Sequence, residues 1–518
     1  MDRVVVVGAG IGGLACALDL AARGCAVTLL ERAAEPGGKM RELIVGSRPV
    51  DAGPTVFTMR WVFEELFADA GATLDSHVTL HPAELLARHA WDADTRLDLH
   101  ADPARSADAI GQLAGAAEAR GFLTFCAEAR RVYETLDAPF IRGPLRSPVG
   151  LAMAVGNPAR LLGIRPFQTM WDAISAHMHD PRLRQLFGRY ATYCGSSPFA
   201  APATLMLVAH VEQQGVWLVA GGMHRLAAAL AGLAASRGAV LRYGTAVAEV
   251  LVDRGRASGV RLETGERIPA DAVVLNADPG AVAAGLLGNA VRHATPATPP
   301  AARSLSAVTF AVEAQACGFP LARHNVFFSA DSRAEFAALG RGERPEDPTV
   351  YVCAQDRGEP GQAPGEVSDG PERLLLLANA PADGDKGGDK TGDNWRDTND
   401  AEIAQCLSRV LDRVGRCGLR LHLGETAATG PAQFHRLFPG TGGALYGSAV
   451  HGPLATFRRP GSRTRVPALY LAGGATHPGA GVPMAALSGR LAASALMADL
   501  ASSRPSRRTA MSGGTSMR

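Results

Sequence analysis

The chain has 518 residues, of which 47% are hydrophobic and 20% are charged, and its formal net charge is +2. This composition argues against global disorder and provides enough apolar side chains for a sizeable core. The near-neutral charge and an aromatic content of only 6% give no sign of a nucleic-acid partner.

The chain opens with a strand, a glycine-rich turn and a helix. Residues 3–7 form an apolar run that is too short for a signal peptide and is typical of a strand buried on both faces. The turn that follows has G-x-G-x-x-G spacing at Gly8, Gly10 and Gly13. A helical pattern and a second apolar strand over residues 26–30 come next, and the strand ends at Glu31.

Each part of this arrangement has a role in dinucleotide binding. Gly8 permits a tight turn, Gly10 lets the backbone approach a pyrophosphate, and Gly13 lets the helix pack closely on the strand. The helix N-terminus offers free N–H groups to the phosphates, and Glu31 can accept hydrogen bonds from a ribose diol. The complete order of elements predicts a dinucleotide site rather than an unrelated glycine turn.

A second glycine turn, at residues 35–40, includes Gly38, Lys39 and Met40. It could cradle the phosphates of the same cofactor from the other side, or it could be a simple β-turn. The segment Asp51-Ala52-Gly53-Pro54-Thr55 follows. Plain NAD dehydrogenases lack this extension.

Residues 56–215 are predicted to be mainly helical, with helical patterns at 61–70 and 104–136. Within residues 141–190 there are seven arginines and only two acidic residues, Asp172 and Asp180. This basic, apolar surface could rest on anionic lipid or be a solvated face over an ordinary core. We find no run of about 18 uncharged apolar residues, so no transmembrane helix is predicted.

The pattern of elements in the middle of the chain predicts that the chain returns there to the nucleotide-binding domain. A helix over residues 224–237 precedes short strands at 239–242, 247–252 and 257–262, which suggest a β-meander, and then one more buried strand at 272–276.

Residues 286–455 are predicted as a mixed α+β region with strands at 307–312 and 374–378. Residues 382–394, rich in Gly, Asp and Lys, suggest a mobile surface loop, with metal binding as a weak alternative. The tail, residues 502–518, is predicted to be disordered.

The C-terminal part repeats the order of strand, glycine-rich turn and helix. A short strand at residues 469–472 leads through Gly473 and Gly474 to a helix that begins near Pro483. The dipole of that helix can face an anionic or electron-rich group. A reduced flavin, which carries negative charge, is such a group.

These motifs resemble the amine oxidase and phytoene desaturase superfamily of flavoproteins. The stretch LYLAGGATHPGAGVPMAALSGR, residues 469–490, is similar to the closing signature of bacterial phytoene-type carotenoid desaturases. Residues 188–198, 217–223 and 378–381 resemble the same family, and the resemblance extends from Val4 to about Leu500.

The resemblance implies an α/β fold with a Rossmann-type domain that binds FAD. That domain is expected in three pieces, with a helical, membrane-facing region and an interleaved α+β substrate domain between them. The expected boundaries are 1–85, 216–285 and 460–501 for the FAD domain, 86–215 for the helical region, and 286–459 for the substrate domain.

The cofactor-binding residues are expected at the turns and strand ends described above, with Val247 near the adenine. They are Gly8, Gly10, Gly12, Gly13, Glu31, Arg32, Gly38, Lys39, Met40, Gly53, Pro54, Thr55, Val247, Asn276, Asp278, Gly473, Gly474, Gly481, Val482, Pro483 and Met484.

The implied reaction removes two hydrogens from adjacent carbons of an acyclic carotenoid, one as hydride to flavin N5 and one as a proton. The chain is most similar to the hydroxyneurosporene (1-hydroxycarotenoid 3,4-) desaturases of purple phototrophic bacteria. Phytoene desaturase, a more distant amine oxidase-like enzyme and a flavin-free prenyl-binding protein of the GDP-dissociation-inhibitor kind are the alternatives. Oxygen or a quinone is the expected electron acceptor.

No residue pattern singles out an acid or base. His477, Arg189 and Asp172 are candidates for catalysis, and Tyr190 is a further polar candidate, but each also suits a structural role. A hydrocarbon substrate must bind by area, at roughly 25 cal/mol per Å², which demands a long apolar tunnel. We therefore expect a peripheral protein on the cytoplasmic side of the inner or photosynthetic membrane.

Eight cysteines are scattered through the chain, and no pair has CxxC spacing. This distribution argues against a zinc site or a disulfide framework and fits a reducing compartment. We expect no metal in the protein.

Overall fold

A parallel sheet is built from three distant parts of the chain. In the computed structural model, which describes residues 1–358, 370–386 and 393–503, the sheet has the order β19-β13-β1-β2-β9. Its strands are β1 (Arg3–Val7), β2 (Ala26–Leu30), β9 (Val240–Arg242), β13 (Ala272–Leu275) and β19 (Leu469–Leu471). Each neighbouring pair is parallel. The predicted α/β class and the Rossmann-type sheet are confirmed.

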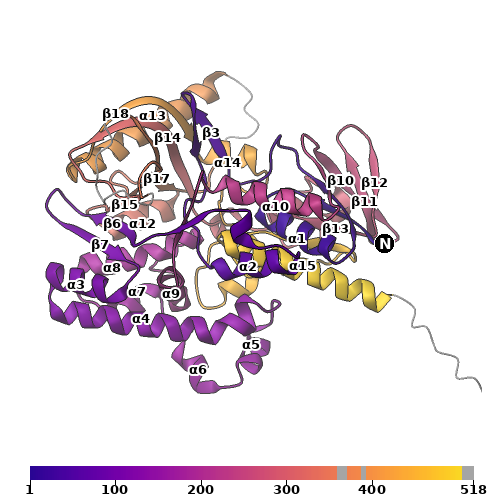
Figure 1. Ribbon diagram of the computed structural model, residues 1–518, viewed down its shortest axis with the longest axis horizontal. Helices are drawn as coiled ribbons and strands as arrows, with labels where there is room; N and C mark the ends of the chain where they lie inside the picture. Colours follow the sequence, from indigo (N-terminus) through magenta and orange to yellow (C-terminus); the bar gives the residue numbers. More distant parts are fainter. Residues whose placement is uncertain (359–369, 387–392, 504–518) are drawn as a thin grey trace, which may run out of the picture.

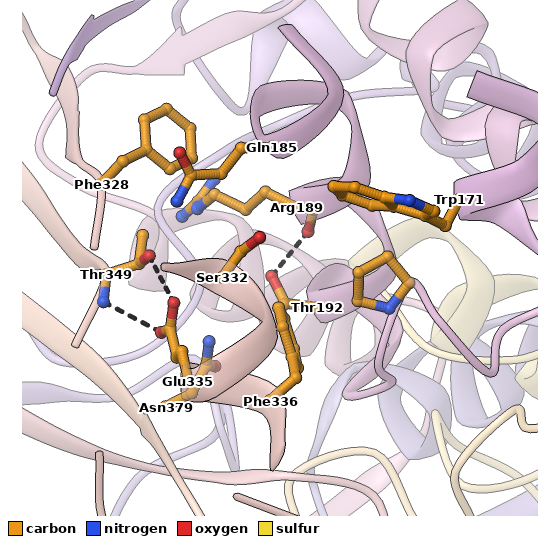
Figure 2. Close-up of a pocket in the computed structure, with 11 residues that line it drawn as sticks. Trp171, Gln185, Arg189, Thr192, Phe328, Ser332, Glu335, Phe336, Thr349 and Asn379 are labelled. Atoms are coloured by element: carbon orange, nitrogen blue, oxygen red, sulfur yellow. Dashed lines mark hydrogen bonds between the residues drawn. The ribbon is translucent and has the colours of Figure 1, made fainter. Parts of the chain in front are cut away.

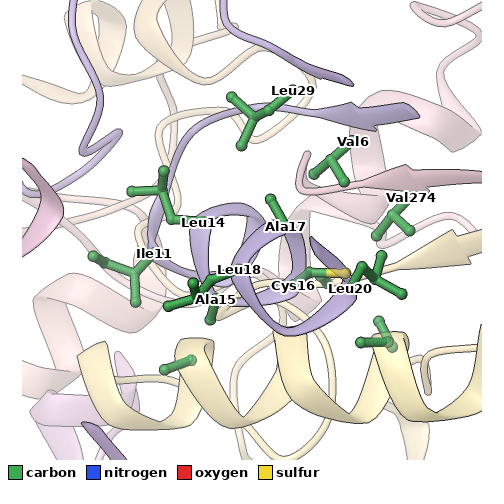
Figure 3. Packing of buried hydrophobic residues seen from close by; sticks show 14 of the residues in the cluster. Val6, Ile11, Leu14, Ala15, Cys16, Ala17, Leu18, Leu20, Leu29 and Val274 are labelled. Atoms are coloured by element: carbon green, nitrogen blue, oxygen red, sulfur yellow. The ribbon is translucent and has the colours of Figure 1, made fainter. Parts of the chain in front are cut away.

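Helix α1 (Ile11–Ala22) packs between this sheet and the C-terminal helix α15 (Val482–Ser503), as Figure 3 shows. Leu14 and Leu18 on α1 are completely buried. A Cβ at Gly489 of α15 would overlap the carbonyl oxygen of Gly12. Gly489 therefore lets the two helix backbones approach closely, which brings the start of α15 toward the first glycine turn.

A three-stranded antiparallel sheet and helix α10 (His224–Ser236) flank the parallel sheet (Figure 1). Its strands are β10 (Val247–Asp253), β11 (Arg256–Leu262) and β12 (Arg267–Pro269). The predicted meander is therefore correct except for residues 239–242. Those residues form β9, which pairs in parallel with β2 at the edge of the larger sheet.

A second large sheet has the order β18-β14-β17-β16-β15-β6-β7. Its strands are β6 (Leu85–Ala90), β7 (Arg96–His100), β14 (Ser306–Cys317), β15 (His324–Phe327), β16 (Val350–Ala354), β17 (Glu372–Ala380) and β18 (Arg420–Thr429). Val350 and Val352 pack in one apolar cluster with Val410 of α13 (Asp393–Arg416). Tyr351, between the two valines on the strand, faces the other side of the sheet.

Two strands of this sheet were missed by the prediction. Residues 80–100 lie in a region predicted to be mainly helical, but they contain β5 (Leu80–Pro82), β6 and β7. Arg88 of β6 pairs with Asp98 of β7 at 2.7 Å across the hairpin. Such pairs satisfy the charges and hydrogen-bonding groups of polar residues in these strands. Because polar residues are tolerated there, the alternation of apolar and polar residues that marks a strand is weak.

Helices dominate from residue 103 to residue 213. They are α3 (Pro103–Ala114), α4 (Ala116–Leu136), α5 (Pro148–Val155), α6 (Pro158–Gly163), α7 (Met170–Ser175), α8 (Pro181–Gly188) and α9 (Leu207–Gln213). The predicted helical stretch 104–136 is divided at Gly115, whose φ of 95° ends one helix and begins the next. Helices α5 and α6 extend away from the rest of the protein at the lower edge of Figure 1.

Shorter elements complete the fold. They are β3 (Glu42–Val45), β4 (Arg48–Asp51), α2 (Arg60–Asp69), β8 (Trp217–Val219), α11 (Pro279–Ala283), α12 (Ser332–Arg341) and α14 (Pro431–Leu437). Of the predicted loop at 382–394, Asp385 forms an ion pair with Arg303 at 2.6 Å, and residues 387–392 lie outside the described residues. Residues 502 and 503 of the predicted tail belong to α15, and residues 504–518 lie outside the described residues.

One helix, Val482–Ser502, is long and apolar enough to cross a membrane, although none was predicted. Half of it is buried in the protein, where it packs on α1. Arg490 interrupts its apolar sequence and forms ion pairs with Glu65 and Asp69 of α2. This placement is that of a core helix.

Candidate functional site

The first glycine turn is closed by contacts that leave no room for side chains. Gly8 has a φ of 99°, and its N–H donates to Leu30 at 2.7 Å. A Cβ at Gly13 would overlap the carbonyl oxygen of Gly8, and a Cβ at Gly10 would lie 2.7 Å from the Asn276 side-chain nitrogen. The turn therefore presents bare backbone at the N-terminus of α1, which is the geometry that a pyrophosphate requires.

Glu31 lies beside this turn at the carboxyl end of β2. Its carboxylate accepts hydrogen bonds from the N–H groups of Ala9 at 2.6 Å and Ala33 at 2.8 Å. Its backbone accepts a bond from Thr245, two residues before Val247 at the start of β10. Arg32, in contrast, is directed away and donates to backbone carbonyls of Arg436 and Leu437.

The second glycine turn lies directly on the first. The Gly37 N–H donates to Ala9, and a Cβ at Gly38 would lie 3.1 Å from the Gly10 Cα. Met40 donates back to Gly37, so the segment is a tight turn as well. The tight turn is therefore confirmed, and the role of this segment in holding the cofactor phosphates stays a prediction.

Lys39 is a buried cation next to a buried carboxyl group. Its ammonium donates to the carbonyl of Leu445 and lies 5.2 Å above the Phe438 ring. Burial lowers the pKa of Lys39, and the charge of Asp278 opposes that shift. Asp278 caps α11 through the Gly280 N–H at 2.8 Å, but its second oxygen is buried without a hydrogen-bond partner among the described residues.

The C-terminal turn meets the first turn. Gly473 has a φ of 112°, and its backbone N and Cα would lie 2.7 Å from a Cβ at Gly12. Gly474 accepts a hydrogen bond from the buried Arg459 at 2.9 Å. Gly481, also at positive φ, precedes the first turn of α15, which contains Val482, Pro483 and Met484. Asn276, Gly12 and Gly473 thus bring three distant motifs to one point.

The segment that begins at Asp51 connects the meeting point of the glycine turns to the seven-stranded sheet. The Asp51 carboxylate accepts from the Met223 N–H at 2.9 Å, and Gln355 bonds both the N–H and the C=O of Asp51 at 2.9 Å. A Cβ at Gly53 would overlap the carbonyl oxygen of Lys39, so the segment packs on the second turn. Pro54 and Thr55 continue toward the sheet, where the Thr55 hydroxyl lies 2.6 Å from the Tyr351 hydroxyl.

The structure does not bring the three catalytic candidates together. His477 is buried, and its Nε2 donates to the Gly143 carbonyl at 2.8 Å, which ties the C-terminal turn to the helical region. Burial lowers the pKa of His477. Asp172 is exposed, and Thr169 caps α7 through the Asp172 N–H and donates to its carboxylate at 2.7 Å. Asp172 is therefore part of a helix cap, and the spacing Thr-x-x-Asp signals that role in the sequence.

The Arg189 side chain is partly buried and lies next to Tyr351 of the seven-stranded sheet. Its guanidinium donates to the Tyr193 hydroxyl at 3.2 Å and lies 5.5 Å from the Tyr351 ring centroid. It lines a pocket between α8, α12 and the sheet, shown in Figure 2. The other lining residues are Trp171, Gln185, Thr192, Pro198, Phe328, Ser332, Glu335, Phe336, Thr349 and Asn379. Tyr190 points elsewhere and donates to Glu212 at 2.6 Å.

Two functional candidates were not found from the sequence. The His324 Nδ1 lies 2.7 Å from the Tyr351 hydroxyl, so Thr55, Tyr351 and His324 form a continuous polar chain. Tyr351 is the one polar residue between apolar neighbours on β16, and His324 begins β15 next to Asn325. No local pattern marks them, because only the fold brings them to Thr55.

Comparisons with known proteins agree with this geometry. Residues 11–316 and 389–497 match the family described as flavin-containing amine oxidoreductase. The chain is 54% identical to a hydroxyneurosporene desaturase of Rubrivivax gelatinosus, over 100% of this chain and 97% of that protein. It is 47% identical to one of Cereibacter sphaeroides, over 97% and 99%. An oxidoreductase structure from Methanosarcina mazei shares the fold, with a TM-score of 0.59 and 15% identity over 96% of this chain and 100% of that one.

Proposed function

The chain belongs to the family of flavin-containing amine oxidoreductases and is an FAD-dependent carotenoid desaturase, and we propose that its substrate is an acyclic carotenoid of the 1-hydroxyneurosporene type, desaturated at C-3,4. The full-length similarity to hydroxyneurosporene desaturases carries this proposal. Phytoene desaturation, an amine oxidase-like reaction and flavin-free prenyl binding are not favoured by these relatives.

FAD fits the residues at the meeting point of the glycine turns. We propose that Gly8, Gly10 and Gly38 hold its pyrophosphate, because side chains are excluded there. Glu31 would bind the ribose, and Asp278 offers a buried oxygen that has an unused hydrogen-bonding capacity. When bound, FAD supplies the acceptor for the hydride, and the second hydrogen leaves the carbon chain as a proton.

The protein's own contribution is to bind the hydrocarbon and exclude water. Phe328, Trp171 and Phe336 lie on different sides of the pocket around Arg189 (Figure 2), and apolar surface of this kind binds a hydrocarbon in proportion to the area buried. Burial lowers the pKa of His324 to about 3, so this side chain is neutral at physiological pH. A neutral imidazole avoids the desolvation cost that a charged His324 would add at this buried position.

Product analysis tests the function directly. The protein is expressed in cells that accumulate either phytoene or 1-hydroxyneurosporene, and pigment masses and absorption spectra are recorded. We expect the loss of two mass units with a red shift on the hydroxylated substrate alone. Serial losses from phytoene would replace the proposal with phytoene desaturation, and no conversion of either substrate by flavin-loaded protein would contradict it.

We further propose that α5 and α6 dock on the membrane that supplies the carotenoid. Four apolar side chains in this region are strongly exposed: Val149 at 69%, Met153 at 77%, Leu162 at 73% and Phe167 at 83%. No acidic residue occurs between residues 143 and 171, whereas Arg146 and Arg160 are exposed there. An apolar surface with basic residues suits an anionic bilayer.

Introducing aspartate at Met153 and Phe167 together should abolish this docking. Each apolar side chain contributes roughly 1.5–3 kcal/mol when buried, so we expect binding to anionic vesicles to fall by more than about tenfold. Co-sedimentation with vesicles measures it. Ile44→Asp is the matched control, because Ile44 is 70% exposed but lies on β3. Equal binding by the double variant and the parent would overturn the docking surface.

A further inference from the structure

We propose that Tyr351 and His324 form the subsite that binds the terminal hydroxyl of the carotenoid and so select the hydroxylated end for desaturation. This inference rests on the proposed function, and it names the residues that discriminate the substrate. It is carried by the buried polar chain, by His324 Nε2, which has no hydrogen-bond partner among the described residues, and by the bond that links this chain to Thr55, a residue expected to bind the cofactor.

The polar chain has one unused hydrogen-bonding position. The Thr55 hydroxyl lies 2.6 Å from the Tyr351 hydroxyl, which lies 2.7 Å from His324 Nδ1. His324 Nε2 is buried and has no hydrogen-bond partner among the described residues. Whichever way the protons are arranged, a neutral imidazole leaves Nε2 as either a donor or an acceptor. A hydroxyl group can satisfy both forms, whereas a hydrocarbon end can satisfy neither.

The hydroxyl of Tyr351 is buried, although the side chain as a whole is only partly so. Burial raises the pKa of its hydroxyl well above the ordinary value, so the group lies deep in the protein. Part of the Tyr351 side chain nevertheless stays accessible. Its nearest surroundings on the sheet are apolar: Val326 and Leu377 pair with it from the neighbouring strands. The Tyr351 hydroxyl is already bonded to Thr55 and His324, so the open position of the chain among the described residues is His324 Nε2.

The position of this chain suits the geometry of the reaction. The hydroxyl of a 1-hydroxylated carotenoid is borne by C-1, only two carbon–carbon bonds from C-3 of the bond to be desaturated. The group that binds the hydroxyl must therefore lie close to the flavin. Thr55 ends the segment that packs through Gly53 on Lys39 of the second glycine turn. Tyr351 is bonded to Thr55 of that segment, which links the polar chain to residues expected to bind the cofactor.

Arg189 supports Tyr351 from the opposite side. Its guanidinium lies 5.5 Å from the Tyr351 ring centroid and 5.4 Å from that of Tyr193. A cation over a tyrosine ring is attracted to its π-face and restricts the ring. A second polar pair near aromatic side chains, Tyr190 with Glu212, lines a separate pocket with Phe122 and Phe187 among the helices. Its two oxygens already bond each other, so it offers a weaker anchor.

Tyr351→Phe tests the inference, because it removes only the hydroxyl, and His324→Phe keeps the ring stacked on Tyr351. Flavin-loaded enzyme is assayed with 1-hydroxyneurosporene as substrate and neurosporene, which lacks the hydroxyl, as competitor. For both variants we expect kcat/KM on the hydroxylated substrate to fall about tenfold, and inhibition by neurosporene to stay unchanged. Bound flavin is measured in each preparation.

Tyr470→Phe is the control, because Tyr470 lies on β19 of the other large sheet and its hydroxyl bonds Asp499 of α15. The kcat/KM of this control on the hydroxylated substrate, and its inhibition by neurosporene, should match those of the parent enzyme. Equal weakening of substrate and competitor, or parent-like kinetics in both variants, would overturn the subsite, as would a loss of discrimination in Glu212→Gln instead. Failure of the parent enzyme to convert 1-hydroxyneurosporene would overturn the proposed function itself.

Discussion

Replacing Gly10 with alanine should yield a folded protein that no longer retains FAD. A Cβ at this position would lie 2.7 Å from the Asn276 amide nitrogen, and that amide bonds the Gly8 carbonyl at 3.3 Å. The substitution also places a methyl group where the backbone must approach the pyrophosphate. We expect bound flavin to fall by more than about tenfold, measured as flavin released per chain.

Gly232→Ala is the matched control for this substitution. Gly232 lies within α10, beside the same parallel sheet, and a Cβ there would meet no atom within 4 Å. Alanine is favoured over glycine in a helix by about 1 kcal/mol, so this variant should keep its flavin and gain slightly in melting temperature. Full flavin content in Gly10→Ala would show that the first turn does not hold the cofactor.

The glycine turns could be predicted because their chemistry is local. Gly8, Gly10, Gly13 and Glu31 fall within one strand–turn–helix–strand unit, so spacing alone indicates what the unit binds. Strands β1, β2, β13 and β19 of the parallel sheet could be predicted for a similar reason, because a strand buried on both faces is a continuous apolar run, whereas the edge strand β9 was assigned to the meander. The roles assigned to these residues in FAD binding remain predictions.

The substrate side could not be predicted in the same way. Thr55, His324 and Tyr351 come from segments separated by 269 and 27 positions in the sequence, and each contributes one side chain. Strand β6 was missed because Arg88 and His89 interrupt its apolar pattern, and the partners of Arg88 are Asp98 on the neighbouring strand and the distant carbonyl of Pro320. Tertiary pairing makes these polar residues acceptable, and pairing is not visible in local sequence.

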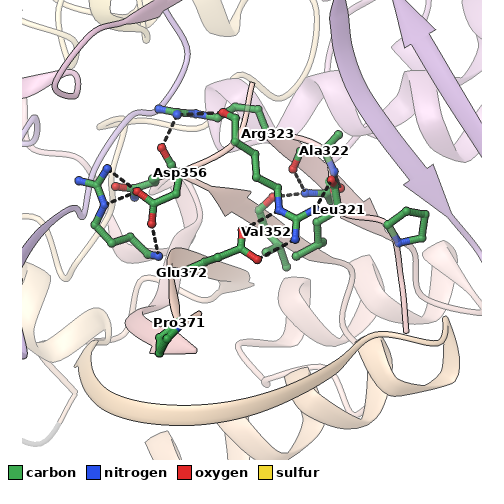
Figure 4. Close-up of polar contacts among 12 residues, drawn as sticks. Leu321, Ala322, Arg323, Val352, Asp356, Pro371 and Glu372 are labelled. Carbon is green, nitrogen blue, oxygen red and sulfur yellow. Dashed lines mark hydrogen bonds and ion pairs between the residues drawn. The ribbon is translucent and has the colours of Figure 1, made fainter. Parts of the chain in front are cut away.

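Removal of Glu372 should destabilise the protein more than loss of any surface ion pair. Arg357 donates to both Glu372 oxygens at 2.6 Å, and the two side chains are only 8% and 1% exposed (Figure 4). Glu372→Ala leaves the guanidinium buried without its partner, which costs about 3–5 kcal/mol in the free energy of unfolding. Chemical denaturation measures the loss. Glu343→Ala is the control, because Glu343 pairs with Arg341 at the surface, at 57% and 60% exposure.

The same variant should also disturb the proposed hydroxyl subsite. Arg357 donates to the Leu321 carbonyl at 2.8 Å, and Arg323 donates to the Arg357 carbonyl at 3.2 Å, so the pair fixes the residues that lead directly into His324 (Figure 4). Replacing both partners, Arg357→Met with Glu372→Leu, removes the uncompensated charge and should recover most of the lost stability. If the single variant is as stable as the parent, the pair does not hold this edge of the sheet. If the double variant regains stability but not selectivity for the hydroxylated substrate, the Leu321 bond is what positions His324.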